Sequence, residues 1–595
     1  MADGDGSSEG MSDGLQVDLF HPDSDREPGD TNIEALGFDV HPIVFPISLV
    51  IIATFVAATI MLGEDASKFF TGIFDYINAT FGWFYIIAVN VFIVTIVYFA
   101  VSKYGSIKIG GVQAEKEFSD FSWMAMLFSA GMGIGLMFFS VAEPMWHFAS
   151  GGGTYFMAEG ESLAAADAAM GVTFFHWGFH PWAIYGLVGL GLAFFSFNRG
   201  LPLTFRSIFW PLLGERIYGW PGHLIDLVTV FATLFGLASS LGFGVAQINA
   251  GVAEVTEILT GSAMVSTGST TVQIGLIAII TGIATMSVAA GLDSGVKRLS
   301  TINLYLMFVF LAFLLIVGPT LFILDTFVGS IGTYFQNFLG MSFYTEAFAP
   351  TANMVDGWPY AGWQHAWTIF YWGWWIAWSP FVGMFIARIS KGRTVREFVI
   401  GVLVLPSLFS FLWLATFGAS ALNISLNKGG GLVTTLFDQG QASAMFAMLQ
   451  SYPLTAVTSV VATLLVVTFF VTSSDSGSLV IDHLTSGGKH DVPRVQRIFW
   501  AVTEGIVAAI LLYGGGLGAL QTAAITTGLP FAVILCLMCY TVYLGLDHEY
   551  DILASEEFRD RVSDLAGEEG VAVERSGSDV VTDVQDSSDA STSDD

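Results

Sequence analysis

Four tryptophans stand close together in YWGWWIAWSP, residues 371–380, within an apolar part of the chain. On a helix Trp375 and Trp378 share one face, and Trp374 adjoins Trp378 one turn away. Several tryptophan rings can surround a quaternary ammonium ion by cation–π attraction, which needs no hydrogen-bond donor on the cation. The stretch predicts either an aromatic site for a methylated ammonium group or a set of rings that packs against a neighbouring helix.

A second aromatic group lies in FFHWGFHPWAIY, residues 174–185. Because Pro181 disturbs a helix, the facing of these side chains is approximate. Trp177, Trp182 and Tyr185 are nevertheless candidates for a second aromatic wall. The neighbouring His176 and His180 are interpreted as packed or hydrogen-bonded, with proton coupling as the alternative.

Glycines alternate in SAGMGIG, residues 129–135. Each glycine in a helix interior costs about 1 kcal/mol relative to alanine. Small residues at this spacing can serve close packing between membrane helices. The alternative is a local unwinding, which exposes backbone N–H groups at the positive end of a half-helix and suits a carboxylate. Together with the tryptophans, such a helix end would accommodate a small zwitterion of the betaine type.

Hydroxyl side chains and one acid crowd FFVTSSDSGS, residues 469–478. Serine and threonine in membrane helices usually donate to carbonyls of the preceding turn. Hydroxyl oxygens combined with carbonyls of unwound backbone would instead make a cage of oxygens that suits a hard monovalent cation such as Na⁺.

The composition defines the elements that must position these residues. The chain has 595 residues, of which 53% are hydrophobic and 12% charged, about half the charged fraction of a soluble protein. Apolar runs of about 20 residues recur along it, which predicts an all-α polytopic membrane protein. The sequence predicts 12 transmembrane helices, over 42–62, 80–101, 122–148, 169–196, 222–256, 271–290, 300–327, 363–388, 396–420, 454–483, 495–514 and 519–545.

Basic residues in the connecting loops predict the orientation of these spans. With both termini in the cytoplasm, fifteen lysines and arginines fall in cytoplasmic loops, whereas only Lys68 and Lys428 fall outside. This asymmetry obeys the positive-inside rule and predicts a multi-pass protein of the cell membrane. The midpoint of the eighth span then falls at Trp375, so the tryptophans lie near the bilayer midplane, and Trp363 and Trp367 are better candidates for an interfacial belt.

The formal charge of −30 is concentrated at the two ends of the chain. Residues 1–36 hold ten acidic residues and one basic residue, and 547–595 hold sixteen and three. Both tails are predicted to be disordered, and their acidity disfavours nucleic acid as a partner. An acidic surplus of this kind indicates a cytoplasm with high salt, hence a halophilic source.

Several other functions are disfavoured by the residues. Cys536 and Cys539 form a CxxC pattern inside an apolar helix, which is interpreted as packing. No cleavable signal peptide is visible. No metal-ligand cluster or nucleophile–base arrangement stands out, so the chain is predicted not to be an enzyme and to need no cofactor. Acids within or near the spans remain functional candidates, or hydrated helix ends: Glu143, Asp226, Glu254, Glu257 and Glu504.

The membrane body resembles the betaine/carnitine/choline transporter family. The resemblance rests on AGMGIGLMF (130–138), HWGFHPWAIY (176–185), WGWWIAWSPFVGMFIARISKGRTVREF (372–398) and FFVTSSDSGS (469–478). It implies a leucine-transporter-type fold of two inverted five-helix repeats (5+5), preceded by two extra N-terminal helices. The implied units are an acidic tail (1–36), two accessory helices (37–121), a first repeat (122–327), an external connecting segment (328–362), a second repeat (363–545) and an acidic tail (546–595).

The resemblance also implies a substrate site. Three rings would line its centre, three would form an aromatic box beside it or on the access route, and glycine-rich backbone would face the substrate carboxylate. These three groups are Trp374, Trp375 and Trp378; Trp177, Trp182 and Tyr185; and Met132, Gly133 and Gly135.

Sodium is the coupling ion that the resemblance implies. One site would use carbonyls of Ser129, Met132 and Phe469 with the hydroxyls of Thr472 and Ser473. Many relatives have alanine at the position of Ser129, which a carbonyl ligand tolerates.

A weaker second Na⁺ site would use Thr229, Thr233 and Phe381. Family members that exchange carnitine without sodium carry a positive side chain or methionine in place of an ion. No lysine or arginine stands between Arg216 and Lys297 here, which favours Na⁺ coupling.

The predicted function is Na⁺-coupled symport of glycine betaine or a similar trimethylammonium zwitterion, for osmoprotection. Choline-transporting relatives carry an acid where this chain has Gly135, which favours betaine. The alternatives are choline, carnitine, ectoine or a sulfonium analogue as the cargo, or a channel or receptor with an ammonium-binding cage. The resemblance also implies a homotrimer, which is common in the family. The osmosensing relatives carry a basic regulatory tail, and this chain has an acidic tail instead, so that regulation is not implied here.

Overall fold

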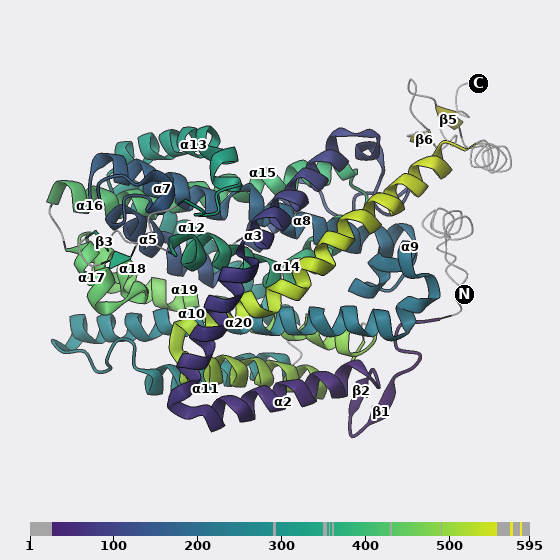
Figure 1. Ribbon diagram of the computed structural model, residues 1–595, viewed down its shortest axis with the longest axis horizontal. Coiled ribbons are helices and arrows are strands. Elements are labelled where there is room, and N and C mark those ends of the chain that lie inside the picture. Colours follow the sequence, from purple (N-terminus) through teal and green to yellow (C-terminus); the bar gives the residue numbers. More distant parts are fainter. Residues whose placement is uncertain are drawn as a thin grey trace, which may run out of the picture.

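The computed structural model describes residues 26–555, except 132, 290–292, 349–353, 356–357, 360–361, 429–430 and 490, together with 572–574 and 583–585. The molecule is a bundle of helices (Figure 1). Its first half contains α2 (Val44–Leu62), α3 (Ala66–Val101), α4 (Asp120–Gly131), α5 (Ile134–Ala149), α6 (Gly153–Phe156), α7 (Leu163–Trp177), α8 (Phe179–Ala193), α9 (Trp210–Leu213), α10 (Trp220–Thr260) and α11 (Thr270–Ala289).

The second half continues the bundle. It contains α12 (Asp293–Val317), α13 (Thr320–Ser342), α14 (Phe370–Arg388), α15 (Val395–Leu414), α16 (Ser420–Lys428), α17 (Leu432–Gln439), α18 (Ala444–Leu449), α19 (Thr455–Thr485) and α20 (Arg494–Leu553). Strands in the described residues form short antiparallel pairs, which are β1 (Ile33–Ala35) with β2 (Phe38–Val40), β3 (Met354–Val355) with β4 (Trp358–Pro359), and β5 (Ala572–Glu574) with β6 (Asp583–Gln585).

Within the described residues, nine helical segments are long and apolar enough to cross a membrane, and a bent pair would make ten. The chain is therefore an all-α polytopic membrane protein. The predicted total of twelve spans and the division into two five-helix repeats stay predictions.

Two glycine-rich places interrupt the helices. The predicted third span is broken, because α4 ends at Gly131 and α5 begins at Ile134, with Gly133 in extended conformation between them. The predicted eleventh and twelfth spans lie together in α20, which is kinked where Gly515 and Gly516 leave helical geometry. Gly516 has φ 61°, which glycine adopts without a steric penalty.

The seventh predicted span ends earlier than expected. It was placed over 300–327, but α12 ends at Val317, and α13 begins at Thr320 after a bend of 108°. Pro319 explains the early end, since proline disfavours helical backbone at the residue before it and cannot donate a helix hydrogen bond. Residues 328–342 of the predicted connecting segment 328–362 therefore belong to helix α13.

The predicted disorder of residues 1–36 is wrong for residues 26–36. Here Asn32 donates to Asp39 Oδ1 (2.8 Å) and to the carbonyl of Ser486 (3.0 Å), and Lys489 pairs with Asp39. These contacts attach the β1–β2 hairpin to the end of α19. The predicted disorder of residues 546–595 is likewise wrong for residues 546–553, which belong to helix α20. Most of the other residues of the two predicted tails lie outside the described part.

Helix α14 carries the tryptophan cluster through the centre of the bundle (Figure 1), where it packs against α8, α10 and α20. Glycines allow the close approach. A Cβ at Gly236 of α10 would lie 2.9 Å from the backbone of Ala377, and one at Gly528 of α20 would lie 2.6 Å from the carbonyl of Gly373. These small residues let α14 pack closely against α10 and α20, and this packing positions the rings of α14 relative to the neighbouring helices.

The interfacial belt predicted for Trp363 and Trp367 is not observed. The two side chains are only 5% and 4% exposed, and both rings pack against the imidazole of His147. They belong to the interior beside the aromatic cluster of α14.

Candidate functional site

Six aromatic side chains of α7, α8 and α14 line one small cavity of about 30 Å³, together with the start of α5. We call this cavity the aromatic pocket. It includes every ring of the two predicted aromatic groups, namely Trp177, Trp182, Tyr185, Trp374, Trp375 and Trp378. A volume of this size holds about one water molecule, so a larger ligand requires the rings to move apart.

Trp375 lies in the middle of the ring contacts. Its centroid lies 4.6 Å from that of Trp374 in a stacked arrangement and 4.9 Å from that of Trp177, edge to face. Tyr185 contacts Trp375 at 6.3 Å and Trp182 at 5.4 Å. Five of the six rings thus form one continuous set, whereas the ring of Trp378 contacts that of Phe381 at 5.3 Å.

Hydrogen bonds hold the indole groups in place. Trp374 Nε1 donates to Ser240 Oγ (3.2 Å), and Trp375 Nε1 donates to the carbonyl of His176 (3.1 Å). A ring fixed through its N–H keeps its two faces for packing or for a cation. Trp378 differs, because it is half-buried and its Nε1 lacks a partner among the described residues.

Trp372 points away from the aromatic pocket. Its ring stacks on His180 at 5.2 Å and meets Phe175 edge to face at 5.4 Å. Of the four tryptophans in the opening stretch, it is the one that serves packing.

The start of α5 closes the aromatic pocket on one side. Gly133 and Gly135 both line it. A Cβ at position 135 would lie 2.6 Å from Cη2 of Trp374 and 3.2 Å from Cη2 of Trp177, so a side chain there would displace a ring. The first N–H groups of α5 have no partner in their own helix, and with the helix dipole they make this end suitable for an anion. The side chain of Met132 lies outside the described part of the chain.

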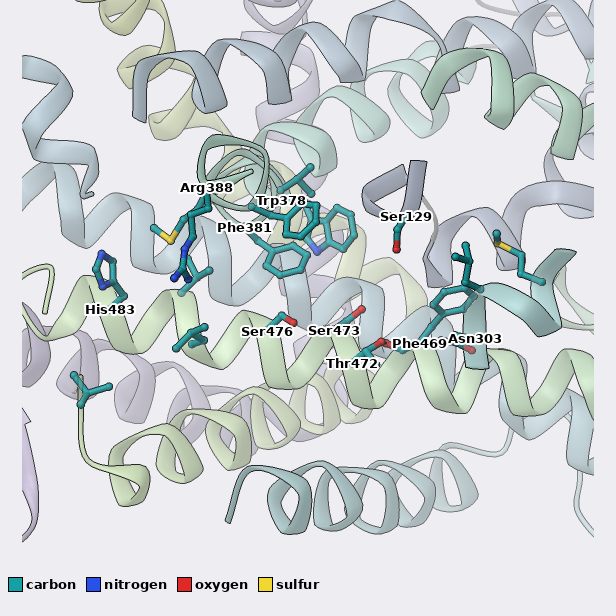
Figure 2. A pocket seen from close by; sticks show the side chains of 18 of the residues that line it. Ser129, Asn303, Trp378, Phe381, Arg388, Phe469, Thr472, Ser473, Ser476 and His483 are labelled. Atoms are coloured by element: carbon teal, nitrogen blue, oxygen red, sulfur yellow. The ribbon is translucent and has the colours of Figure 1, made fainter. Parts of the chain in front are cut away.

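A much larger cavity of about 550 Å³, which we call the vestibule, adjoins the aromatic pocket, and Trp378 and Ser473 line both. Figure 2 shows this vestibule between α14 and α19, with Arg388 and His483 at one end and Ser129 and Asn303 at the other. Its basic end lies on the side that the loop charges predict to be cytoplasmic. A ligand in the aromatic pocket would reach the vestibule by passing Trp378.

Four of the five residues predicted for the first ion site line the vestibule, whereas Met132 lies outside the described part of the chain. The four are Ser129, Phe469, Thr472 and Ser473, and in Figure 2 Ser129 lies across the cavity from the other three. Helix α19 continues unbroken from Thr455 to Thr485, so the predicted carbonyl ligand of Phe469 belongs to regular helix, where it accepts from Thr472 Oγ1 (3.2 Å). Hydroxyl and carbonyl oxygens are suitable ligands for Na⁺.

The residues of the second predicted ion site are less clearly assembled. Thr233 Oγ1 donates to the carbonyl of Thr229 (2.7 Å), and Thr229 Oγ1 donates to that of Ile225 (2.8 Å). Both hydroxyls therefore make the usual bond within their own helix, whereas Phe381 lines the vestibule beside Trp378.

A polar cluster behind the rings is hardly predictable from the sequence. Glu143, His147 and His176 lie close enough to hold a metal ion in principle, although a metal-ligand cluster was not predicted. Glu143 and His147 stand one helical turn apart in the sequence, which is the one signal available. Ser240, which fixes Trp374, is a further residue of the site that carries no distinguishing pattern.

The fold and the site thus define an α-helical membrane protein with an aromatic pocket between its helices. A family model for betaine/carnitine/choline transporters matches residues 43–551, and the chain belongs to this family. It is 45% identical over 546 residues to a glycine betaine/proline/choline transporter of Vibrio parahaemolyticus, with 89% of this chain and 94% of the relative covered.

Two further relatives have similar names. Glycine betaine transporter 1 of Vibrio parahaemolyticus is 44% identical over 90% of this chain and 99% of its own length. A glycine betaine transporter of Acinetobacter baylyi is 43% identical over 85% of this chain and 74% of its own length. These relatives are named as transporters.

Proposed function

We propose that this chain imports glycine betaine, or a similar trimethylammonium zwitterion, by Na⁺-coupled symport across the cell membrane for osmoprotection. The observation that carries the proposal is the aromatic pocket, in which six rings surround a cavity that ends at the N-terminus of α5. The rings suit a quaternary ammonium group, and the helix end suits its carboxylate.

The ion is assigned to the hydroxyls of Thr472 and Ser473, which line the vestibule opposite Ser129. Ser473 also lines the aromatic pocket. An ion bound there would connect α19 with the break between α4 and α5, and would stabilise the end of α5 that binds the carboxylate. This shared position supports coupling between ion and substrate.

Transport into proteoliposomes tests the proposal. With an inward Na⁺ gradient, labelled glycine betaine should accumulate above its external concentration, and choline, carnitine and ectoine should compete weakly. Uptake that only equilibrates would indicate a channel. Equal accumulation in K⁺-only buffer would contradict sodium coupling, and stronger uptake of another zwitterion would change the substrate.

Gly135→Asp should create choline uptake, because choline lacks a carboxylate and needs a countercharge from the protein. The same change should lower the affinity for betaine, since Cβ at this position would meet Trp374 at 2.6 Å. Gly135→Asn is the matched control, with the same size and no charge. Choline uptake at background in a well-expressed Asp variant, or equal gains in both variants, would contradict this account of specificity.

The membrane orientation with both termini cytoplasmic and the assembly as a homotrimer are part of the same proposal. The orientation follows from the loop charges, and accessibility labelling tests it. The trimer follows from the family, and the mass of the purified protein tests it.

A further inference from the structure

A carboxylate lies directly behind the aromatic pocket. Glu143 of α5 is completely buried. Its Oε2 accepts hydrogen bonds from the indole N–H of Trp177 (2.8 Å) and from the hydroxyl of Tyr371 (2.5 Å). Trp177 lines the pocket, and Tyr371 stacks on Trp375. One carboxylate thus restrains aromatic rings of two different helices.

Two histidines complete the surroundings of this carboxylate. Oε1 of Glu143 lies 2.6 Å from His176 Nδ1 and 3.5 Å from His147 Nε2. An ionised carboxylate has about four positions for accepting hydrogen bonds, and here Trp177, Tyr371 and His176 contact it at hydrogen-bond distance. His147 Nε2 lies within ion-pair distance but makes no hydrogen bond among the described residues. A charged group in a buried membrane site needs several partners of this kind.

A hydrogen bond also determines where the proton lies on neutral His147. Trp363 Nε1 contacts His147 Nδ1 at 3.3 Å. Because an indole N–H can only donate, Nδ1 must accept, which leaves the proton of neutral His147 on Nε2, facing Glu143. His176 likewise directs Nδ1 to Glu143, while its Nε2 meets the hydroxyl of Thr368 at 2.9 Å.

This proton position argues against a metal ion at Glu143, His147 and His176. A metal would need the lone pair of His147 Nε2, and the proton would then move to Nδ1, where it would oppose the N–H of Trp363. The cluster is better explained as a hydrogen-bond network around an anion.

We infer that Glu143 is a positioning residue of the substrate site, which fixes Trp177 and Tyr371 and adds negative potential behind the aromatic pocket. The fixed rings keep Trp375 in place, because it contacts both of them and donates to the His176 carbonyl. A negative charge at the N–H edge of Trp177 favours a cation at the face of that ring, since the attraction is electrostatic. The inference rests on the proposed binding of a trimethylammonium group.

Glu143→Gln tests the inference with little change in shape. The amide would direct N–H groups at donors, and fewer of the three hydrogen-bond partners would keep an acceptor. We expect the dissociation constant of radiolabelled glycine betaine for the purified protein to rise about tenfold or more. Glu549→Gln is the matched control, because Glu549 is a buried carboxylate paired with Arg199 (2.6 Å) away from the rings. Equal affinity in wild type and Glu143→Gln would overturn the inference.

A double-mutant cycle separates positioning from a general loss of stability. Trp177→Phe keeps an aromatic face but removes the N–H that reaches Glu143. If Glu143 acts through Trp177, the loss of affinity in the double variant is smaller than the product of the two single losses. A double loss equal to that product would overturn the inference, whatever the thermal stability of the variants.

A spectroscopic test does not depend on the substrate. In protein labelled with 5-fluorotryptophan, the ¹⁹F resonance of Trp177 is assigned by its loss in Trp177→Phe. It should shift in Glu143→Gln and stay in place in Glu549→Gln. An unchanged resonance in Glu143→Gln would overturn the inference, as would stoichiometric copurified zinc that is lost in His147→Gln. Failure of the wild type to bind betaine, with the expected ¹⁹F shift, would overturn the proposed function and leave the position of Trp177 explained by Glu143.

Discussion

Trp375→Leu is expected to weaken the binding of glycine betaine by about 1–2 kcal/mol or more, the contribution of a desolvated cation–π contact, which is about tenfold in the dissociation constant. Trp375 is 4% exposed and contacts Trp177, Tyr185 and Trp374. Leucine restores part of the buried volume but offers no negative ring face to a cation. Equilibrium binding to the purified protein measures the change.

Trp378→Leu should weaken the binding of glycine betaine to a similar extent, and its effect is easier to interpret. The Trp378 indole N–H has no partner among the described residues, so its replacement breaks no hydrogen bond of the free protein. The ring lies where the aromatic pocket meets the vestibule. A loss of affinity in this variant would therefore report the ring face itself.

Trp372→Leu is the matched control. It removes a tryptophan of the same helix whose ring packs on His180 and Phe175 outside the pocket. It should lower the thermal stability and leave the affinity for betaine close to that of the wild type. If all three leucine variants bind betaine equally well, the rings have a packing role only and the assigned site is wrong.

The sequence could predict the rings because their spacing carries the information. Aromatic side chains at i, i+3 and i+4 share a helix face, and the apolar runs place that face inside a membrane bundle. The break in the third span was also predictable, since three glycines at alternating positions make helix unfavourable there. The structure brings these predicted parts together around one pocket.

The polar residues behind the rings could not be predicted in the same way. Glu143 contacts Trp177 and Tyr371, which lie 34 and 228 positions further along the chain. Such contacts depend on how α5, α7 and α14 cross, and no local pattern records a crossing. The burial of Trp363 and Trp367 was missed for the same reason, since depth along a helix does not tell which side of it faces the bundle.

Predictions from local sequence also failed where side chains of one segment bind to a distant segment of the chain. The acidic composition of residues 1–36 predicts disorder, yet Asn32 donates to the carbonyl of Ser486, and Asp39 of the same hairpin pairs with Lys489, both near the end of α19. Conversely, the crowding of hydroxyls in 469–478 predicts disturbed backbone as one alternative, but α19 is continuous there, and Thr472 makes the usual bonds of a membrane threonine to the carbonyls of Thr468 and Phe469.

This last arrangement leads to the second prediction of large effect. The Thr472 hydroxyl uses its hydrogen to bond its own helix, at 3.0 Å and 3.2 Å from the two carbonyls. Its oxygen lone pairs remain able to face a cation in the vestibule, where Ser473 and Ser129 also lie. The usual helix bond of a membrane threonine is thus compatible with a ligand role.

Replacing Thr472 and Ser473 together by alanine should raise the Na⁺ concentration needed for half-maximal betaine uptake by about tenfold or more. Two oxygen ligands of a charged ion are lost, and even one hydrogen bond to a charged group contributes about 1.5–3 kcal/mol. Uptake into proteoliposomes at a series of Na⁺ concentrations, with K⁺ replacing Na⁺ at constant ionic strength, gives the value.

Ser476→Ala is the control for this pair, because Ser476 lines the same vestibule one turn further along α19. It removes a hydroxyl from the same surface and should leave the Na⁺ dependence unchanged, whereas Thr472→Ser with native Ser473 should preserve it by keeping both oxygens. An unaltered Na⁺ dependence in the double alanine variant would contradict the assignment of the ion site to Thr472 and Ser473. The coupling would then have to be sought at Thr229 and Thr233, whose hydroxyls make the same kind of bond within α10.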